Sequence, residues 1–318
     1  MQTLVSKGAA RSKVEPSESE LRHLLARARP GRVGDLGINA ILRADRIDAW
    51  AFPVQRALRR FAMMPGFRHA KDFLNGTWLG HPLHPALTDV PIGAWTAALI
   101  FDAMTVAHLR KLDRAAEAAI GVGIAGAGAS ALAGLADWAD TNTSQRRVGF
   151  VHAGLNSLAL GLQIASLVCR KRRLRGGRVL STLGYGVTVL AGYLGGALVY
   201  RQGAQVSRNA YERAPRAFTP ALREERLLPD EPTRAMVGGT AVVLVKHVGE
   251  VFALSDVCSH AGCPLSQGRI ERDAIVCACH GSTYRLRDGA ALHGPSPFAQ
   301  PSFDVRVESG VVEIRKRA

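Results

Sequence analysis

Two short segments decide the fold of the C-terminal part of this chain: Cys258-Ser-His260-Ala-Gly-Cys263-Pro-Leu265 and Cys277-Ala-Cys279-His280-Gly-Ser282-Thr-Tyr284. Each segment places one cysteine close to one histidine, and sixteen residues separate the two pairs. Thiolate sulfur and imidazole nitrogen are strong ligands for transition metals. The two segments therefore predict two loops that meet around a metal centre.

Two thiolates and two imidazoles form the ligand set of a Rieske [2Fe–2S] centre. We assign Cys258 and Cys277 to the inner iron, and His260 and His280 to the outer iron, nearer to solvent. The alternative is a tetrahedral Cys₂His₂ zinc site, but zinc fingers place two cysteines in one half and two histidines in the other. Here each half has one of each. The region from about 225 to 318 therefore resembles a Rieske iron–sulfur domain, whose histidine ligands raise the potential to roughly −150 to +300 mV.

Two further cysteines, Cys263 and Cys279, lie beside the ligand pairs and are not needed as ligands. A disulfide between them would join the two loops, and the alternative is a pair of buried free thiols. The paired arrangement resembles the high-potential Rieske proteins of cytochrome bc-type quinol-oxidising complexes. Soluble Rieske ferredoxins usually have Gly and Trp at these positions.

Ser282 and Tyr284 also match that bc-type subgroup. The resemblance implies that the serine hydroxyl bonds a bridging sulfide and that the phenol bonds a ligand sulfur, which raises the potential. The alternatives are a turn serine and a strand aromatic. The stretch Gly294-Pro-Ser-Pro297 resembles the proline loop that covers the cluster in this family.

The 318-residue chain is strongly basic, with a net charge of +15 and a pI of about 10.4. The basic residues gather at the ends of apolar segments, which indicates membrane topology rather than nucleic-acid binding. The remaining cysteine, Cys169, is expected to be an inert small hydrophobe. The first thirty residues lack the apolar core of a cleavable signal.

Four apolar segments of about 20 residues each predict transmembrane helices: 87–108, 115–136, 148–169 and 179–200. The predicted fold is therefore an α-helical membrane domain of four transmembrane helices followed by a small all-β Rieske domain. We predict four divisions: a basic N-terminal segment with amphipathic helices (1–75), the membrane domain (76–200), a linker (201–224) and the Rieske domain (225–318). Residues 1–35 are expected to be disordered or loosely helical. The helices of 36–75 would lie on the membrane surface or on the protein's own membrane domain.

The loops between the spans predict the orientation of the protein. The first and third loops carry nine Lys and Arg residues, and the second carries only Arg146 and Arg147. The positive-inside rule makes the first and third loops cytoplasmic, so the Rieske domain would be extracytoplasmic at a bacterial cytoplasmic membrane. Four arginines after the last span oppose this orientation, and disulfide formation would support it.

The first span is preceded by Leu79-Gly-His81-Pro-Leu-His84-Pro85. This motif resembles an uncharacterised family of four-helix membrane proteins, a domain of unknown function that is sometimes fused to Rieske domains. The candidate polar residues at this face of the membrane are His81, His84, Asp89, Asp137, His152 and Asn156.

Three interpretations of these polar residues compete. The histidines could ligate haem b axially, or line a quinol (quinone) pocket with the aspartates. Alternatively, the residues are helix caps and interface charges, with Asp137 and Asp140 near Arg146 and Arg147.

The function predicted first is a membrane-anchored electron carrier. It would take electrons from quinol or a membrane haem and pass them to a soluble or periplasmic acceptor, with cytochrome-type proteins as partners. The alternatives are a cytoplasm-facing redox partner of an oxygenase or desaturase, or a membrane redox sensor. A second domain with the two histidines and one carboxylate of an oxygenase iron site is not evident, so the chain is expected to be an electron carrier or an oxidoreductase subunit.

Overall fold

The structure, a computed structural model, describes residues 33–62 and 64–317. Most of the predicted loosely ordered segment, 1–35, lies outside this range. The chain divides into two compact units, Met1–Arg43 and Ala44–Ala318. Within the first unit, helix α2 spans Val33–Arg43.

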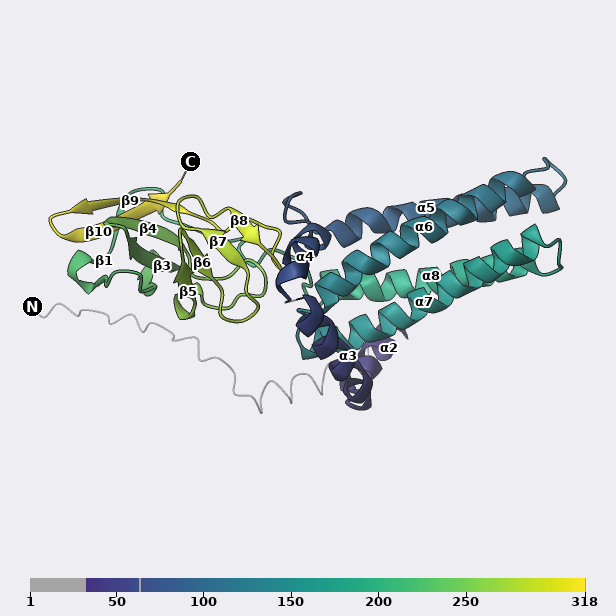
Figure 1. Ribbon diagram of the computed structural model, residues 1–318, viewed down its shortest axis with the longest axis horizontal. Coiled ribbons are helices and arrows are strands. Elements are labelled where there is room, and N and C mark those ends of the chain that lie inside the picture. Colours follow the sequence, from purple (N-terminus) through teal and green to yellow (C-terminus); the bar gives the residue numbers. More distant parts are fainter. Residues whose placement is uncertain (1–32, 63, 318) are drawn as a thin grey trace, which may run out of the picture. The chain divides into compact units, whose positions relative to one another are not determined.

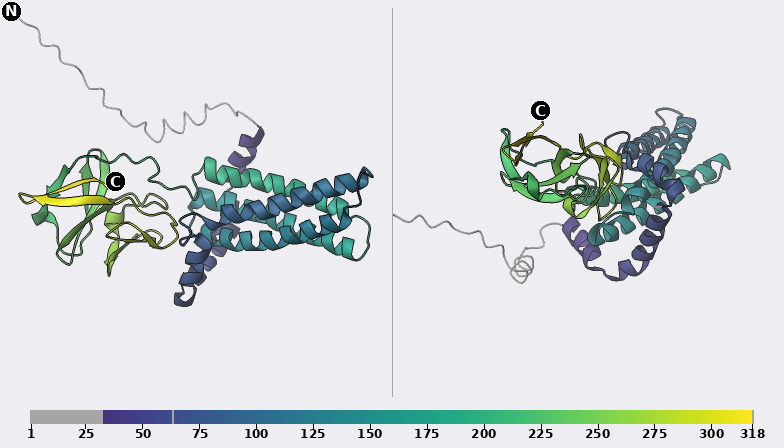
Figure 2. Two further views of the ribbon diagram at one scale, coloured as in Figure 1. Left: turned by 90° about the horizontal axis from the view of Figure 1, so that it is seen from above. Right: turned by 60° about the vertical axis from the view of Figure 1, so that its left-hand side comes forward.

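Four long helices form the membrane part of the second unit (Figure 1): α5 Leu83–Val106, α6 Asp113–Trp138, α7 Thr143–Lys171 and α8 Gly177–Tyr200. All four are long and apolar enough to cross a membrane, which confirms the predicted fold class. Helix α5 packs along α6, and α7 packs along α8, so the bundle consists of two antiparallel hairpins (Figure 2). The two hairpins contact each other less extensively than the helices within each hairpin do.

Glycines bring the helices of the bundle close together. A Cβ atom at Gly123 of α6 would lie 2.1 Å from Nε1 of Trp95 on α5. A Cβ at Gly149 of α7 would lie 2.5 Å from Cδ1 of Trp138 on α6. Small residues at such contacts let helix backbones approach within a membrane. Gly123 on α6 and Gly149 on α7 therefore allow close packing of neighbouring helices.

Three short elements precede the bundle: α3 Arg46–Ala62, the 3₁₀ turn η1 Pro65–Phe67, and α4 Arg68–Asn75. Helix α3 is docked on the bundle, because Gln55 Nε2 donates to Trp138 O at 2.8 Å. Asp48 also pairs with Arg146 at 2.8 Å. The outer side of α3 exposes Trp50 and Phe52, which leaves an apolar surface for the lipid interface.

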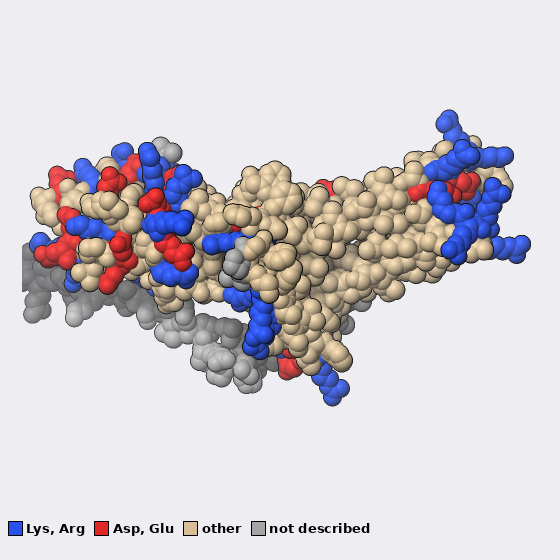
Figure 3. Space-filling view, viewed as in Figure 1, with Lys and Arg blue, Asp and Glu red and all other residues tan. Residues whose placement is uncertain are grey.

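Lys and Arg side chains gather at one end of the bundle (Figure 3). This end holds the α5–α6 and α7–α8 connections. Lys171 pairs with Glu117 at 2.9 Å and Arg178 with Asp113 at 2.5 Å. Arg170 makes a two-bond contact with the buried Asp102. The basic loops predicted by charge therefore form a common cap at one end of the four helices.

The C-terminal part is a β domain of three antiparallel sheets (Figure 1). The first sheet has the order β1-β10-β9 and the second β2-β3-β4. Their bounds are β1 Thr219–Arg223, β2 Thr233–Val237, β3 Thr240–His247, β4 Glu250–Ser255, β9 Phe303–Glu308 and β10 Val311–Lys316. The third sheet joins β5 Arg269–Glu271, β6 Ala274–Val276, β7 Thr283–Arg285 and β8 Ala291–His293 in sequence order. The β domain also contains two 3₁₀ turns, η2 Glu224–Arg226 and η3 Leu265–Gln267.

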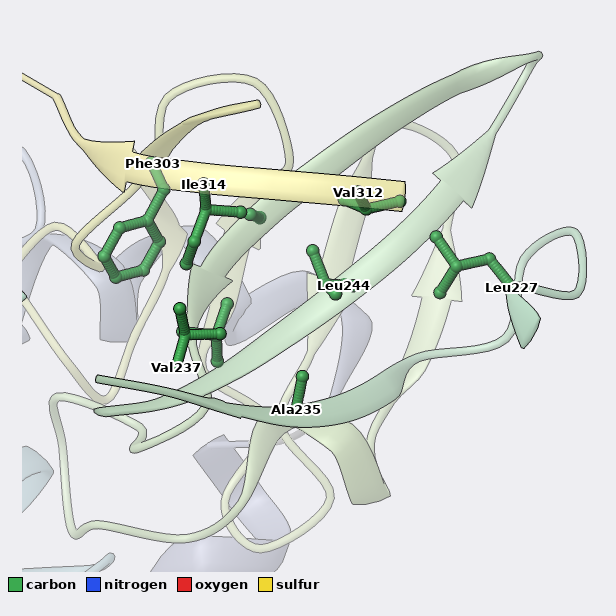
Figure 4. Close-up of a cluster of buried hydrophobic side chains, with 9 residues drawn as sticks. Leu227, Ala235, Val237, Leu244, Phe303, Val312 and Ile314 are labelled. Carbon is green, nitrogen blue, oxygen red and sulfur yellow. The ribbon is translucent and has the colours of Figure 1, made fainter. Parts of the chain in front are cut away.

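Strand β3 is central because both of its faces are buried. Leu244 packs with residues of the first and second sheets, among them Val237, Phe303 and Ile314 (Figure 4). Val243, on the other face, packs with Tyr284 and other residues beneath the two cysteine–histidine loops. A strand buried on both faces reads as a continuous apolar run, which matches Ala241-Val-Val-Leu-Val245.

The β domain begins earlier than predicted. Strand β1 lies inside the predicted linker 201–224 and pairs antiparallel with β10, with Thr219 opposite Ile314. Its residues Thr-Pro-Ala-Leu-Arg include a proline, a residue that is tolerated only at sheet edges. Proline made this segment look like a linker, whereas the structure places it on an edge strand.

The buried position of Leu244 yields a stability prediction. Leu244→Ala should lower the free energy of unfolding of the β domain by about 2–5 kcal/mol, because it leaves a cavity in the core. Leu228→Ala, at an exposed position, should change it by about 0.5 kcal/mol or less. Pulse proteolysis of the full-length protein in detergent over a urea series measures both. Equal effects of the two variants would contradict the described core.

Candidate metal centre

Two loops with the same local turn carry the predicted ligands. In the first loop, Cys258 N donates to Cys263 O at 2.9 Å, and Gly262 N donates to Cys258 O at 2.8 Å. In the second, Gly281 N donates to Cys277 O at 3.0 Å. Gly262 and Gly281 both have φ +81°, a left-handed conformation that glycine adopts without steric cost. The glycine after each ligand pair is therefore required by the turn.

The two loops bring the four predicted ligands together in two pairs. The thiols of Cys258 and Cys277 are buried and hydrogen-bonded to each other. The rings of His260 and His280 are half-buried, with centroids 4.9 Å apart and planes at 80°. His260 Nδ1 is buried without a hydrogen-bond partner. A buried nitrogen left unpaired in this way is suited to bind a metal.

A disulfide joins the loops. Cys263 and Cys279 are bonded with an S–S distance of 2.08 Å and a Cα–Cα distance of 6.5 Å. The alternative of two free thiols is therefore wrong. In the described part of the chain, Cys169, Cys258 and Cys277 are the free cysteines.

The arrangement fits two irons better than one zinc ion. A tetrahedral zinc site directs four donors to a single point. Within residues 33–62 and 64–317, no three His, Cys, Asp or Glu side chains converge as ligands of one ion. A [2Fe–2S] cluster needs only two protein donors on each iron, because sulfides supply the others. A buried thiol pair beside a half-buried imidazole pair meets that requirement.

The ionisation states of the four side chains also suit metal binding. The hydrogen bond with Cys258 lowers the pKa of Cys277 to about 6, and the same bond, together with burial, raises the pKa of Cys258. Burial lowers the pKa of His260 to about 3 and also lowers the pKa of His280. Both imidazoles are therefore neutral at pH 7, and one cysteine is a thiolate, as a metal requires.

Tyr284 lies directly beneath the thiol pair. Its hydroxyl lies 3.3 Å from Cys258 Sγ and 2.9 Å from Ser259 Oγ. Tyr284 is fully buried, and burial raises the pKa of its phenol, so the group stays protonated and can donate to sulfur. Ser282 is also buried, and its Oγ accepts from Ser296 N at 3.1 Å. Its hydroxyl hydrogen therefore remains free to donate.

Two residues of this site, Ser259 and Gln300, were missed from the sequence. Ser259 Oγ lies 2.8 Å from Ser296 Oγ, which connects the first ligand loop to the proline-rich loop. Gln300 accepts from Ser259 N at 3.0 Å and donates to Ser255 O at 2.8 Å. A serine and a glutamine near turns look like ordinary loop residues, and only their burial distinguishes them.

Within the same compact unit, helix α3 contacts the second ligand loop, and helix α4 contacts the end of β8 and the proline-rich loop. Arg59 Nη2 donates to Cys279 O at 2.9 Å. Asp72 binds the proline-rich loop through both oxygens: Gly294 N donates to one at 2.9 Å, and His293 Nδ1 lies 2.7 Å from the other. These contacts were not predicted, because more than 200 residues separate Asp72 from His293 in the chain.

The predicted membrane constellation separates into different groups. His81 and Asp89 are exposed. Asp137 accepts from Asn75 at 2.9 Å, which places it in a buried polar group with α4. His84 and His152 face each other with ring centroids 6.4 Å apart, and Asn156 lies beside His152.

The predicted charge pairing of Asp137 and Asp140 with Arg146 and Arg147 is wrong. Asp140 pairs with Lys71 at 2.5 Å and with Arg59 at 3.6 Å. Both arginines pair with Asp48 instead. Proximity in sequence suggested the first pairing, whereas α3 and α4 fold back and supply the actual partners.

Two ligand loops on an antiparallel β domain, joined to a four-helix membrane unit, define a membrane-associated iron–sulfur protein. Residues 217–304 match the Rieske [2Fe-2S] domain, and residues 80–208 match a predicted membrane protein family, DUF2231. The chain belongs to the Rieske family. It is an iron–sulfur electron-transfer protein, homologous both to Rieske subunits of bc1 and b6-f complexes and to dioxygenase ferredoxins.

Each of the following relatives matches less than a third of this chain. The chain is 36% identical over 73 residues to the cytochrome b6-f complex iron-sulfur subunit of Chlorobaculum tepidum, which is 23% of this chain and 39% of that subunit. It is 33% identical over 98 residues to the ferredoxin component of biphenyl 2,3-dioxygenase from Rhodococcus jostii, which is 31% of this chain and 92% of that protein. A solved ferredoxin of carbazole 1,9a-dioxygenase from Nocardioides aromaticivorans is 26% identical, with a TM-score of 0.31, and covers 32% of this chain and 99% of that one.

The contact between Tyr284 and Cys258 yields a prediction for the potential of the centre. Tyr284→Phe should lower the reduction potential by about 50–130 mV, because a lost hydrogen bond of about 1–3 kcal/mol no longer stabilises the reduced state. Ser282→Ala should also lower the reduction potential. Tyr211→Phe, at an exposed position, is the control. Redox titration followed by EPR measures all three, and unchanged potentials for both site variants would place their hydroxyls away from the sulfurs.

Proposed function

We propose that this protein carries single electrons between the membrane and a soluble or periplasmic acceptor through a [2Fe–2S] cluster. Cys258 and Cys277 would hold the inner iron, and His260 and His280 the outer iron. When bound, the cluster would supply one-electron oxidation and reduction. The observation that carries the proposal is the buried cysteine pair beside the pair of neutral imidazoles, next to the contacts of α3 and α4.

The surroundings of the ligands support a high-potential centre. Tyr284 and Ser282 place two hydroxyls at the thiol side, where donated bonds favour the reduced state. The Cys263–Cys279 disulfide holds the two loops together. These three features match the resemblance of the sequence to Rieske proteins of cytochrome bc-type complexes. In those complexes quinol is the electron donor.

The contacts of α3 and α4 hold the imidazole side close to the membrane unit. Arg59 binds the second ligand loop, and Asp72 binds the loop that follows β8. A Cβ atom at Gly294 would lie 3.1 Å from Asn75 Oδ1, so the two surfaces approach closely. We infer that the donor is in the membrane, as quinol or as haem, and that the outer imidazoles receive its electrons.

Charge supports an extracytoplasmic position for the β domain. The basic cap lies at the opposite end of the bundle from the Asp137 and Asp140 group, and the positive-inside rule places that cap in the cytoplasm. A disulfide persists in an oxidising compartment, which agrees with this orientation.

A second candidate is a cytoplasm-facing redox partner of an oxygenase. It is favoured by one observation: the chain covers 92% of the biphenyl dioxygenase ferredoxin component. The orientation of the β domain distinguishes the two candidates.

Replacement of a ligand tests the cluster. Dithionite-reduced protein should show the EPR signal of low average g-value that is typical of a Rieske centre. His280→Ala should abolish it, because one iron loses half of its protein donors. His247→Ala, at the C-terminal end of strand β3 and away from the ligand loops, should retain it. A full signal in the His280 variant would contradict the ligand assignment.

Reporter fusions test the orientation. Alkaline phosphatase fused after Ala318 should be active, and green fluorescent protein fused there through the general export route should be dark. Fusions after Gly176, in the basic cap, should show the reverse. The opposite pattern at both positions would place the β domain in the cytoplasm and favour the oxygenase partner.

A further inference from the structure

Two histidines from different hairpins face each other within the membrane bundle. His84 lies in the first turn of α5 and His152 in the first half of α7. Their ring centroids are 6.4 Å apart, with an interplanar angle of 89°. Intramembrane polar side chains are costly and are usually functional. The metal centre described above does not use this pair.

Each ring is fixed by the partner helix of its own hairpin. His84 Nδ1 lies 2.8 Å from Ser130 O on α6, and His152 Nδ1 lies 2.8 Å from Ala191 O on α8. A carbonyl can only accept, so Nδ1 carries the proton in both rings, and Nε2 keeps its lone pair. This second contact is the usual way in which a protein orients a metal-binding histidine.

Glycines make room for both rings. A Cβ atom at Gly134 would lie 2.9 Å from His84 Cε1, and one at Gly195 would lie 3.1 Å from His152 Cε1. Both distances are shorter than ordinary carbon contacts, so a larger residue would displace the rings. The same arrangement of glycine, histidine and accepting carbonyl therefore occurs once in each hairpin.

Asn156 is the polar neighbour of this pair. Its Nδ2 lies 3.1 Å from His152 Nε2 and also donates to His152 O at 2.9 Å. The first contact agrees with an unprotonated Nε2. An incoming ligand at Nε2 would replace this contact, and the amide would retain its bond to the carbonyl.

The spacing of the rings matches two axial ligands of one iron. A metal–imidazole bond is about 2 Å long, so the centroids of two imidazoles on opposite sides of one metal lie roughly 6 Å apart. A cation bound by protein side chains alone would need further donors, and in the described residues no three His, Cys, Asp or Glu side chains converge. A porphyrin supplies four nitrogens itself and needs only the two histidines.

We propose that haem b binds between the two hairpins, with His84 and His152 as its axial ligands. The hairpins contact each other sparingly, and the helices provide the apolar surroundings that a porphyrin requires. This proposal rests on the proposed electron-carrier function, and it names haem as the group that would donate electrons to the [2Fe–2S] cluster. One electron from ferrous haem, which becomes ferric, would reduce one ferric iron of the [2Fe–2S] cluster to ferrous, and no bond or proton changes place. Oxidation of one quinol to quinone releases two electrons and two protons, so it would re-reduce the haem twice in succession, and both protons would leave to solvent.

The test is the optical spectrum of full-length protein, purified in detergent from cells supplied with a haem precursor. Oxidised and dithionite-reduced spectra should show a low-spin b-type haem, with about one haem per chain by pyridine haemochrome. His84→Ala and His152→Ala should each lose more than nine tenths of it. His81→Ala is the matched control, because His81 is an exposed histidine three residues before His84, and it should retain the haem.

Two measurements separate this proposal from folding defects and from the proposed function. His152→Met should keep haem with an altered low-spin spectrum and a higher potential, because methionine is an alternative axial ligand. The EPR signal of the [2Fe–2S] cluster should persist in the His81, His84 and His152 variants. Protein with a full cluster signal and no haem, even after addition of hemin, would overturn the proposal and leave the electron-carrier function intact. Haem retained in both alanine variants would overturn it as well.

Discussion

The burial of two thiols and two imidazoles at the meeting point of two loops is the constraint on which the rest of the β domain depends. Buried polar groups without partners are costly, and His260 Nδ1 has none in the described structure. The disulfide and two left-handed glycines shape the loops, and Gln300 and Ser259 fix the first loop. Strand β3, buried on both faces, joins this region to the main core. The domain is thus built to hold donors in pairs rather than around one point.

Charged side chains of α3 and α4 connect the β domain to the membrane unit. The two carboxylate oxygens of Asp72 bind His293 and Gly294 at the end of β8, and Arg59 binds the Cys279 carbonyl in the second ligand loop. Charge-assisted hydrogen bonds of this kind are stronger than neutral ones. Lys71 and Asn75 of α4 bind Asp140 and Asp137 at the end of α6. Helix α4 therefore binds the end of β8 and the start of the proline-rich loop on one side and the bundle on the other, which suits a centre that exchanges electrons with a membrane donor.

Short sequence patterns predicted the structural features that depend on residues close together in the chain. The four spans are confirmed, because segment length and hydropathy determine them, and the Cys263–Cys279 disulfide suggested by its position beside the ligand pairs is present. Strand β1 was predicted as linker because it contains a proline, and strands β5, β7 and β8 have only three residues each, too few for a recognisable pattern. The contacts of Asp72, Arg59 and Gln300 depend on residues that the fold brings together from distant parts of the chain. The charge pairing predicted for Asp140 was wrong for the same reason. The ligand roles of Cys258, His260, Cys277 and His280 stay predictions that the observed geometry supports.

Metal and sulfide analysis of the purified protein tests the central claim most directly. Two irons and two acid-labile sulfides per chain are expected, because a Rieske cluster has two irons joined by two sulfides and only two protein donors on each iron. Any haem iron is counted separately by pyridine haemochrome and subtracted. One zinc ion per chain without sulfide would contradict the claim, since the four side chains would then surround a single ion.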